Sequence, residues 1–502
     1  MNVTSHDLLR LLPLIFPALA SLIVLLFAAV NPNDRTWGPL VAVAAAGASV
    51  AAIVWGPAAG GEPLLGGMLV MDRYTVFFLL LVMAMLAGAV SVAAAGWRAS
   101  DYAHGEFWAL MLFATCGMGL LAASTNLLLI FIGVELMSIS VYALVGSDRG
   151  RPRPPEAALK YFLLGAFSSA FLLFGIAFVY GATGSFELRD IFRTTSSAMY
   201  GAPRAEMLLG ISLMLVGFGF KTSTAPFHMW TPDAYTGAPS PVTAFMASAV
   251  KAASFAAFIR VFAMSLGPAR GFWSDIIAVA AALTIVVGNF GAITQTELKR
   301  LLAYSGIAHA GYMLIGLRAA SIDPDLATPS ILFYLFAYTF TTLGLFAIVT
   351  AIERWQGKEI RLADLAGLSR RHPLMAAAMT IFLLALAGVP PTSGFTAKLY
   401  VFSAAVKIGD YLLAVIGVLA SAVSLYYYLR VVVFMYMREP EPGDETNTAT
   451  AEPFARLPSI YAVVACAVLV VLIAGALPEG FLRFARAASA SASAGVAHVS
   501  GI

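Results

Sequence analysis

Charged side chains are scarce in this chain of 502 residues. Lys, Arg, Asp and Glu together make up 11% of it, whereas soluble domains carry roughly 25%. This composition excludes an ordinary soluble domain. The net charge of +3 is also too small to predict a nucleic-acid partner.

The sequence has only two cysteines and none of the common cofactor-binding motifs. Cys116 and Cys466 each lie in an apolar stretch, cannot form a metal cluster alone, and are interpreted as small core residues. The sequence has no phosphate-binding loop, dinucleotide fingerprint, nucleophile triad or metal-ligand spacing. We therefore expect no cofactor, metal or redox active site in this chain, so any redox chemistry must take place in partner subunits.

Apolar residues are abundant, at 60%. They recur in runs of about twenty, the length that a helix needs to cross a bilayer, whereas a barrel would alternate apolar and polar residues. We expect an all-α polytopic membrane protein with about fourteen transmembrane helices. The expected spans are 9–30, 38–56, 74–96, 107–125, 127–146, 157–182, 205–228, 240–265, 274–293, 299–318, 328–353, 373–404, 410–436 and 458–477.

Two of the expected spans are interrupted. In the seventh, Lys221 is followed by Thr-Ser-Thr-Ala and then Pro226; in the twelfth, Gly388-Val-Pro-Pro-Thr-Ser-Gly394 precedes Lys398. Proline removes a backbone donor, and carbonyls freed within a membrane need partners from protein or water. The breaks lie five spans apart, so a tandem five-span copy would enter the membrane inverted. Paired broken helices point to a transport site.

This layout predicts a single membrane domain over 1–502 with four parts. Residues 1–100 form helices 1–3, while 107–265 (helices 4–8) and 274–436 (helices 9–13) form two inverted five-helix repeats. The last helix and a tail occupy 437–502, and the tail from Ala487 to Ile502 is expected to be loose because it is rich in Ala and Ser.

The loop charges predict the orientation. An even number of spans puts both termini on one side, and loop Lys and Arg residues are more numerous on the other, which favours that other side as cytoplasmic. We therefore expect a multi-pass protein of the bacterial inner membrane with both termini in the periplasm. Membrane-interface anchors are predicted at Trp97, Trp108, Trp230 and the run Tyr426-Tyr427-Tyr428.

Four lysines lie inside expected spans: Lys160, Lys221, Lys251 and Lys398. A lysine at the centre of a lipid-facing helix costs roughly 2.5–3.5 kcal/mol, so we expect these side chains to face protein or water. Buried ionisable groups in membranes usually mark an ion or proton route. Two alternatives are open: Lys160, near the cytoplasmic edge, can snorkel, and Lys398 can simply bind the carbonyls freed by the break.

Three further residues fit such a route. Glu135, mid-way along the fifth span, is the expected partner of Lys221, because a buried carboxylate and ammonium stabilise each other; a static structural pair is the alternative. His309 lies mid-span and titrates near neutral pH, which suits a proton relay. His228 follows the first break, at a possible cytoplasmic entry. Each histidine can instead be a hydrogen-bonding or capping group.

Four long motifs carry a resemblance to one known family. They are Pro226–Met246 (PFHMWTPDAYTGAPSPVTAFM) followed by Lys251-Ala-Ala, Glu156–Ala166 (EAALKYFLLGA), Leu301–Tyr312 (LLAYSGIAHAGY) and Ala387–Lys398 (AGVPPTSGFTAK). These segments resemble subunit N of proton-translocating NADH–quinone oxidoreductase, respiratory complex I, which belongs to the antiporter-like membrane subunits.

The resemblance implies a proton-translocating subunit of an oxidoreductase whose redox centres lie elsewhere. Glu135 and Lys221 would be the first pair, Lys251 the central relay and Lys398 the group near the exit, with Lys160, His228 and His309 auxiliary. NADH, FMN, iron–sulfur clusters and quinone would belong to partner subunits. The implied partners are the other membrane subunits, the hydrophilic redox arm and membrane lipids.

Departures and alternatives accompany this resemblance. Thr236 stands where the family usually has Glu, and Val250 replaces a common proline before the central lysine, which predicts a less broken eighth span. A subunit of a multi-subunit sodium/proton antiporter is the first alternative. Subunit M is disfavoured by lysine at 398, and subunit L by the short segment after the last span. A scaffold that only anchors other subunits would make every buried lysine structural.

Overall fold

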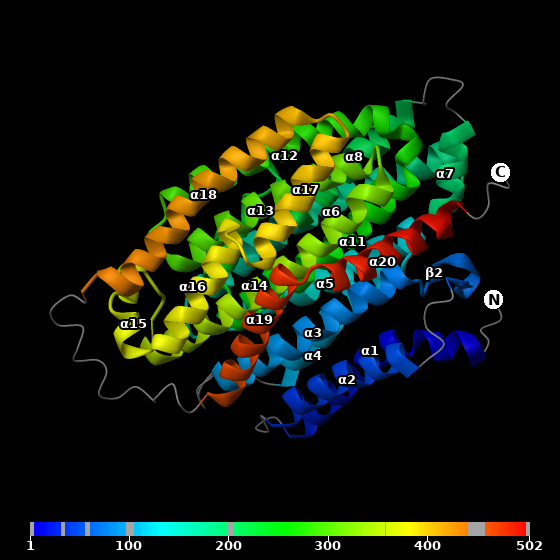
Figure 1. The fold of residues 1–502 in the computed structure, drawn as a ribbon. Helices are drawn as coiled ribbons and strands as arrows, with labels where there is room; N and C mark the ends of the chain where they lie inside the picture. Colours follow the sequence, from blue (N-terminus) through cyan, green and yellow to red (C-terminus); the bar gives the residue numbers. More distant parts are fainter. Residues whose placement is uncertain are drawn as a thin grey trace.

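The computed structural model describes residues 5–31, 36–55, 61–96, 105–197, 205–356, 358–439 and 457–497. The described residues form a bundle of apolar helices (Figure 1), and twelve helical spans among them are long and apolar enough to cross a membrane. Helices predominate because a backbone in lipid must satisfy its own hydrogen bonds. The predicted all-α polytopic class is confirmed.

The helices follow the apolar runs closely. The N-terminal part contains α1 (Ser5–Val30), α2 (Trp37–Trp55), the hairpin β1 (Pro63–Leu64) and β2 (Leu69–Val70), and α3 (Arg73–Gly96). The next part contains α4 (Gly105–Ala123), α5 (Leu127–Val145), α6 (Arg153–Thr183), α7 (Leu188–Ser197), α8 (Ala205–Thr222), α9 (Trp230–Gly237), α10 (Ser240–Phe245), η3 (Met246–Val250), α11 (Lys251–Phe258) and η4 (Ile259–Ser265).

The second half also contains long helices and an interrupted one. It contains α12 (Arg270–Ile293), α13 (Leu298–Ala320), α14 (Pro324–Gln356), the short α15 (Leu368–Arg371), α16 (Pro373–Ala387), α17 (Ser393–Lys407) and α18 (Tyr411–Met437). The chain closes with α19 (Pro458–Ala476) and α20 (Glu479–Ala497).

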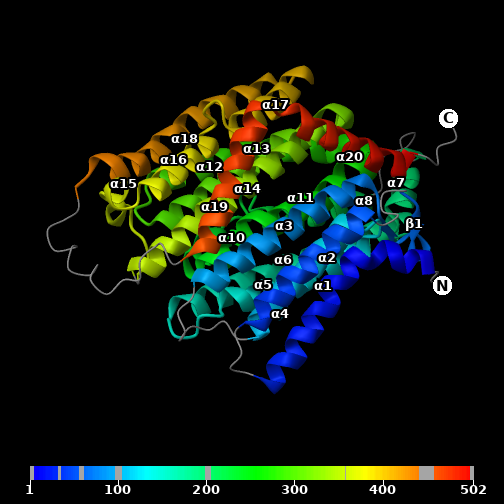
Figure 2. The same ribbon diagram turned by 60° about the horizontal axis from the view of Figure 1, so that its bottom comes forward.

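One helix occupies the centre of the bundle. The segments α10, η3, α11 and η4 join into a continuous helix, and every residue from Ser240 to Ser265 is buried. In Figure 2, α3, α10 and α14 lie side by side. This central helix is therefore enclosed by protein, so Lys251 on it avoids the cost of a charge facing lipid.

The prediction of a loose tail is wrong as far as Ala497. Residues 479–497 form α20, the red helix that ends the chain in Figure 1, which packs against α3 and α14. Its buried residues Leu482, Ala485, Ala488 and Ala492 are spaced three or four apart, the pattern of an amphipathic helix. Residues 498–502 lie outside the described part of the chain.

The interface-anchor prediction is wrong for most of its residues. Tyr427, Tyr428, Trp108 and Trp230 are buried, whereas Tyr426 is exposed and Trp97 lies outside the described residues. Successive side chains of a helix point about 100° apart, so a run of three cannot share one surface. The core prediction for the cysteines holds for Cys116, but Cys466 is exposed.

Candidate functional site

The break after α8 is confirmed, and neighbouring polar groups satisfy it. Ser223 has a φ of 63°, in the left-handed region, and α9 starts only at Trp230. The Ala225 N–H donates to Thr284 Oγ1 at 3.0 Å, which fixes the broken segment to α12. Lys221 occupies the last turn of α8, directly before this break.

The break between α16 and α17 is also confirmed, and Lys398 lies over it. Its ammonium donates to the carbonyls of Leu386 at 2.9 Å and Ala387 at 3.0 Å, and to Ser421 Oγ at 2.8 Å. These carbonyls belong to the last turn of α16, where intrahelical donors run out. Lys398 therefore binds the freed carbonyls, as the structural alternative for this lysine predicts. It is also buried.

The predicted Glu135–Lys221 ion pair is absent from the described residues. Lys221 is buried, and its ammonium donates to the Tyr142 hydroxyl at 2.9 Å. Half-buried Glu135 instead accepts a hydrogen bond from Ser169. Direct pairing is thus wrong for this conformation, because Tyr142, two turns further along α5, holds the amine.

Lys251 lies at the start of α11, in the middle of the central helix. Its ammonium donates to the Gly306 carbonyl at 2.6 Å and lies 5.2 Å from the centre of the Tyr338 ring. The span is continuous around Lys251, in line with the expectation of a less broken eighth span, but Met246–Val250 form a π-helical turn without proline. Such turns often mark functional positions.

His309 bridges the space between Lys251 and Lys398. Its ring lies 5.1 Å from that of Tyr338 and 5.7 Å from that of Tyr312, and the Lys398 ammonium lies 5.0 Å from the Tyr312 ring centre. We call Lys251, Tyr338, His309, Tyr312 and Lys398 the buried relay. All five are 5% exposed or less, so the relay is enclosed by the bundle.

Hydrogen bonds fix the imidazole of His309 in place. Its Nδ1 lies 2.7 Å from the Tyr334 hydroxyl and its Nε2 lies 3.2 Å from the Tyr428 hydroxyl. Each phenol can donate or accept, and the ring can do either at each nitrogen according to its tautomer. The site thus has both the donors and the acceptors that proton transfer needs.

The structure does not bring Lys160 or His228 to this relay. Lys160 is half exposed and pairs with Glu156 at 2.7 Å and Asp233 at 3.4 Å, as expected for a lysine at the membrane edge. His228 lies in the turn before α9, and its buried Nδ1 has no hydrogen-bond partner among the described residues. Both therefore lie outside the buried relay.

A fourth buried lysine was not predicted from the sequence. Lys299 donates to the Ala238 carbonyl at 2.6 Å and lies 3.6 Å from Glu353, which also accepts from Ser240 Oγ at 2.6 Å. These bonded groups lie around Ser240, the first residue of α10. Lys299 stands in a polar stretch between two apolar runs, so no sequence signal distinguishes it from a loop lysine.

The described residues offer no metal site. No three His, Cys, Asp or Glu side chains in that part of the chain lie close enough together to hold an ion.

Comparison with known proteins gives one consistent result. Residues 124–424 match the family model described as NADH:quinone oxidoreductase/Mrp antiporter, TM. NADH-quinone oxidoreductase subunit N of Trichlorobacter lovleyi is 44% identical over 419 residues, 84% of each chain. The Myxococcus xanthus subunit N is 41% identical over 97% of this chain and 99% of its own.

The chain belongs to the subunit N family of NADH-quinone oxidoreductase. The family resemblance found in the sequence is therefore confirmed. A chain of respiratory complex I from Thermus thermophilus has a TM-score of 0.76 at 36% identity, over 94% of this chain and 98% of that one. A chain of the Mrp complex from Dietzia has a TM-score of 0.83 at 23% identity, over 97% and 98%, which shows a shared fold alone. The relatives named subunit N thus favour this family over the antiporter alternative.

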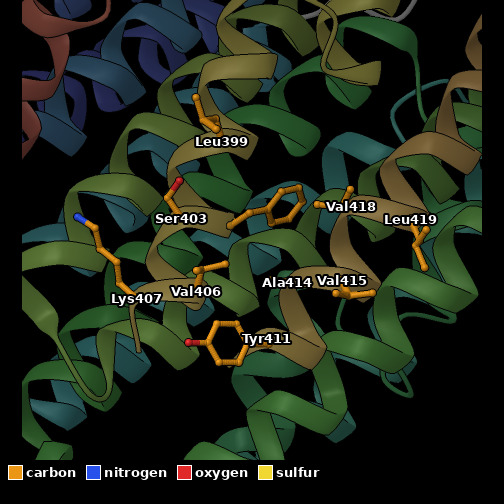
Figure 3. Close-up of a pocket in the computed structure, with 10 residues that line it drawn as sticks. Leu399, Ser403, Val406, Lys407, Tyr411, Ala414, Val415, Val418 and Leu419 are labelled. Carbon is orange, nitrogen blue, oxygen red and sulfur yellow. The ribbon is translucent and has the colours of Figure 1, made fainter. Parts of the chain in front are cut away.

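An open groove beside Lys398 is separate from the relay of this subunit N chain. It has a volume of about 640 Å³ and runs between α17 and α18, with Lys407 as the one charged residue among the ten that line it (Figure 3). Leu399 and Val415 in it are exposed on the outside of the bundle. Lys398 is not among the ten lining residues, and its ammonium contacts carbonyls of α16 instead.

Gly388 gives a first prediction for this subunit N chain. It has a φ of 83°, and an added Cβ would lie 2.9 Å from Lys398 Cδ. Gly388→Ala is expected to displace the lysine and to lower NADH-driven proton uptake per assembled complex several-fold. Gly409→Ala is the matched control, because Gly409 also has a φ of 83° but no atom within 4 Å of an added Cβ. Both carry a left-handed strain of roughly 1–2 kcal/mol, so equal effects would contradict the prediction.

Proposed function

We propose that this chain moves protons along the buried relay as the membrane subunit N of an NADH–quinone oxidoreductase. Its family makes it a proton-translocating membrane subunit of an oxidoreductase complex. The route itself is the proposal, and one observation carries it. An amine, a phenol, an imidazole, a second phenol and a second amine follow one another inside a membrane bundle, at ring-centre distances of 5.0–5.7 Å.

The chemistry of the relay suits proton transfer. Each amine or imidazole can hold or release a proton, and each phenol can accept one hydrogen bond while donating another. Intramembrane ionisable groups that face a bundle interior usually belong to such pathways. A lysine becomes neutral when it passes its proton to the next group and charged again when it accepts another. Lys251 and Lys398 would therefore alternate between charged and neutral forms.

Glu135 and Lys221 are proposed as the switch that feeds this relay. In the described conformation Ser169 holds Glu135 and Tyr142 holds Lys221. Approach of the carboxylate would stabilise the ammonium and retain its proton, and separation would release the proton toward Lys251. Electron transfer in partner subunits would drive the alternation. Lys160, His228 and His309 remain proposed auxiliary groups, with His309 inside the relay.

The proposed setting is the bacterial inner membrane, with both termini in the periplasm. Other membrane subunits and the hydrophilic redox arm would be the partners, and these would hold NADH, FMN, the iron–sulfur clusters and quinone. Residues 107–265 and 274–436 are proposed as the two inverted repeats, since each contains one broken helix that carries a lysine.

Glu135→Gln tests the switch. The neutral amide can still accept from Ser169 but cannot stabilise an ammonium, so NADH–quinone turnover coupled to proton uptake is expected to fall several-fold while assembly is retained. Turnover per assembled complex, measured in inverted membrane vesicles, gives the result. Glu156→Gln is the matched control, because Glu156 pairs only with exposed Lys160, and such surface pairs contribute roughly 0–1 kcal/mol. Parental turnover in Glu135→Gln would contradict the switch.

A further inference from the structure

A second buried charge lies on the central helix beyond Lys251. Arg260 is in η4, roughly 13 Å from Lys251 at 1.5 Å per residue, and it pairs with Asp72 just before α3. The two side chains are 3% and 2% exposed. The η4 segment packs against α7 and α20, at the end of the bundle where α1 begins and α20 ends (Figure 1), which we call the terminal side.

The pair is held from several directions. Arg260 donates to both carboxylate oxygens of Asp72, at 3.1 and 3.2 Å, and also to Thr75 Oγ1 at 3.2 Å and the Ala122 carbonyl at 3.0 Å. Asp72 in turn accepts from the Thr75 N–H at 2.7 Å, which caps α3. One ion pair therefore joins the start of α3, the end of α4 and the terminal-side end of the central helix.

Tyr74 and α20 surround the Asp72–Arg260 pair. The Tyr74 ring lies 4.7 Å from the Arg260 guanidinium, and its hydroxyl donates to the Ala256 carbonyl at 2.8 Å. Ala256 lies on the central helix between Lys251 and Arg260. Outside the pair, α20 packs on α3 and η4, and the Arg73 N–H donates to Ser491 Oγ at 2.9 Å. Every residue of the central helix between Lys251 and Arg260 is thus buried, and Tyr74 and α20 pack against its terminal-side end.

We infer that the Asp72–Arg260 pair seals the terminal side of the central helix, so that a proton on Lys251 leaves along the relay toward Lys398 rather than directly across the membrane. This inference rests on the proposed function. A matched pair needs no water to compensate its charge, because each charge neutralises the other. The two terminal guanidinium nitrogens of Arg260 are hydrogen-bonded, and only its buried Nε has no partner among the described residues. Removal of one partner leaves a buried charge without compensation, and such a charge recruits water into the protein. Water at this position would connect Lys251 to the terminal side.

Asp72→Asn tests the seal in the complete complex. The complex is reconstituted in phospholipid vesicles that contain a pH-sensitive dye, and proton entry is recorded after an acid jump without NADH. We expect several-fold faster passive proton entry than for the parental complex, together with fewer protons moved per NADH oxidised. Parental leakage in assembled Asp72→Asn complex overturns the seal.

The double variant Asp72→Leu with Arg260→Met separates a seal from a carrier. Apolar replacement of a buried ion pair is often neutral for stability, so a seal predicts parental leakage and parental pumping. Loss of pumping in an assembled, non-leaking double variant would mean that the pair itself carries protons, and would overturn the inference. Failure of both variants to assemble would also overturn it, because the pair would then be an assembly element.

Lys251→Met in the same vesicles tests the proposed function separately. Parental proton uptake in that variant would reject the relay, whatever the leakage of Asp72→Asn. If Lys251→Met pumps like the parental complex but Asp72→Asn leaks, the relay is rejected. The seal formed by Asp72 and Arg260 would still hold as a property of the fold. The two failures therefore give different results.

Discussion

Lys251→Met is expected to reduce NADH-driven proton uptake by about tenfold or more, because a positioned proton-transfer group contributes roughly 10²-fold or more. Lys251 is the end of the relay on the central helix, and its ammonium is the group that contacts both the Gly306 carbonyl and the Tyr338 ring. Methionine has nearly the same length but cannot hold a proton. Proton uptake per assembled complex in vesicles measures the effect.

The variant complex should still assemble. Its cost is one hydrogen bond to a carbonyl, on the order of 1–3 kcal/mol when the partner is left unsatisfied, and methionine adapts well to irregular apolar sites. Lys407→Met is the matched control, since Lys407 is exposed at the end of α17 and lies outside the relay. We expect its uptake to stay close to parental.

This experiment also decides between a carrier and a scaffold. If the buried lysines only support the fold, Lys251→Met would reduce the amount of assembled complex but leave uptake per complex unchanged. The relay predicts the opposite pattern, with assembly retained and uptake lost. Quantifying the complex and its proton uptake in the same vesicles separates the two.

The features that could be predicted from the sequence are residues that do not fit an apolar membrane helix, namely prolines and charges. Pro226 and the Pro390-Pro391 pair lie within apolar runs, where proline cannot continue a helix, and both breaks are present in the structure. Lys221, Lys251 and Lys398 were found for the same reason, since a charge in an apolar run must face protein or water. All three are buried.

Side-chain partners could not be predicted in the same way. Glu135 and Lys221 attract each other in principle, but Tyr142 takes the amine, and this choice depends on how α5 and α8 pack. The tyrosines of the relay look like any other aromatic residues in an apolar run. Arg260 lies within a predicted span, yet its partner Asp72 precedes a different span, so the pair becomes visible only in three dimensions.

Two local structures depended on tertiary packing. The π-helical turn at Met246–Val250 forms without proline, so no residue in the sequence predicts it. The Ala- and Ser-rich tail resembles a flexible segment in composition, but α20 forms because its small residues pack closely on α3 and α14. Helices of this length are stabilised mainly by such packing rather than by intrinsic propensity.

Lys398→Met is expected to reduce proton uptake by about tenfold or more, by the same proton-transfer argument, and it also tests the structural alternative. The Lys398 ammonium binds the carbonyls freed at the end of α16, so its loss would affect both the relay and the break. Lys407→Met is the matched control on the same helix, because Lys407 is exposed at the end of α17 and lies outside the relay.

Lys398→Arg distinguishes the two roles of this residue. A guanidinium can donate to the same carbonyls but stays protonated in proteins, so a purely structural lysine would be replaced with little loss of uptake. A relay residue must release its proton, so Lys398→Arg should assemble and yet pump as poorly as Lys398→Met. Parental uptake in the arginine variant would show that charge at the break is sufficient, and the route would then have to end before Lys398.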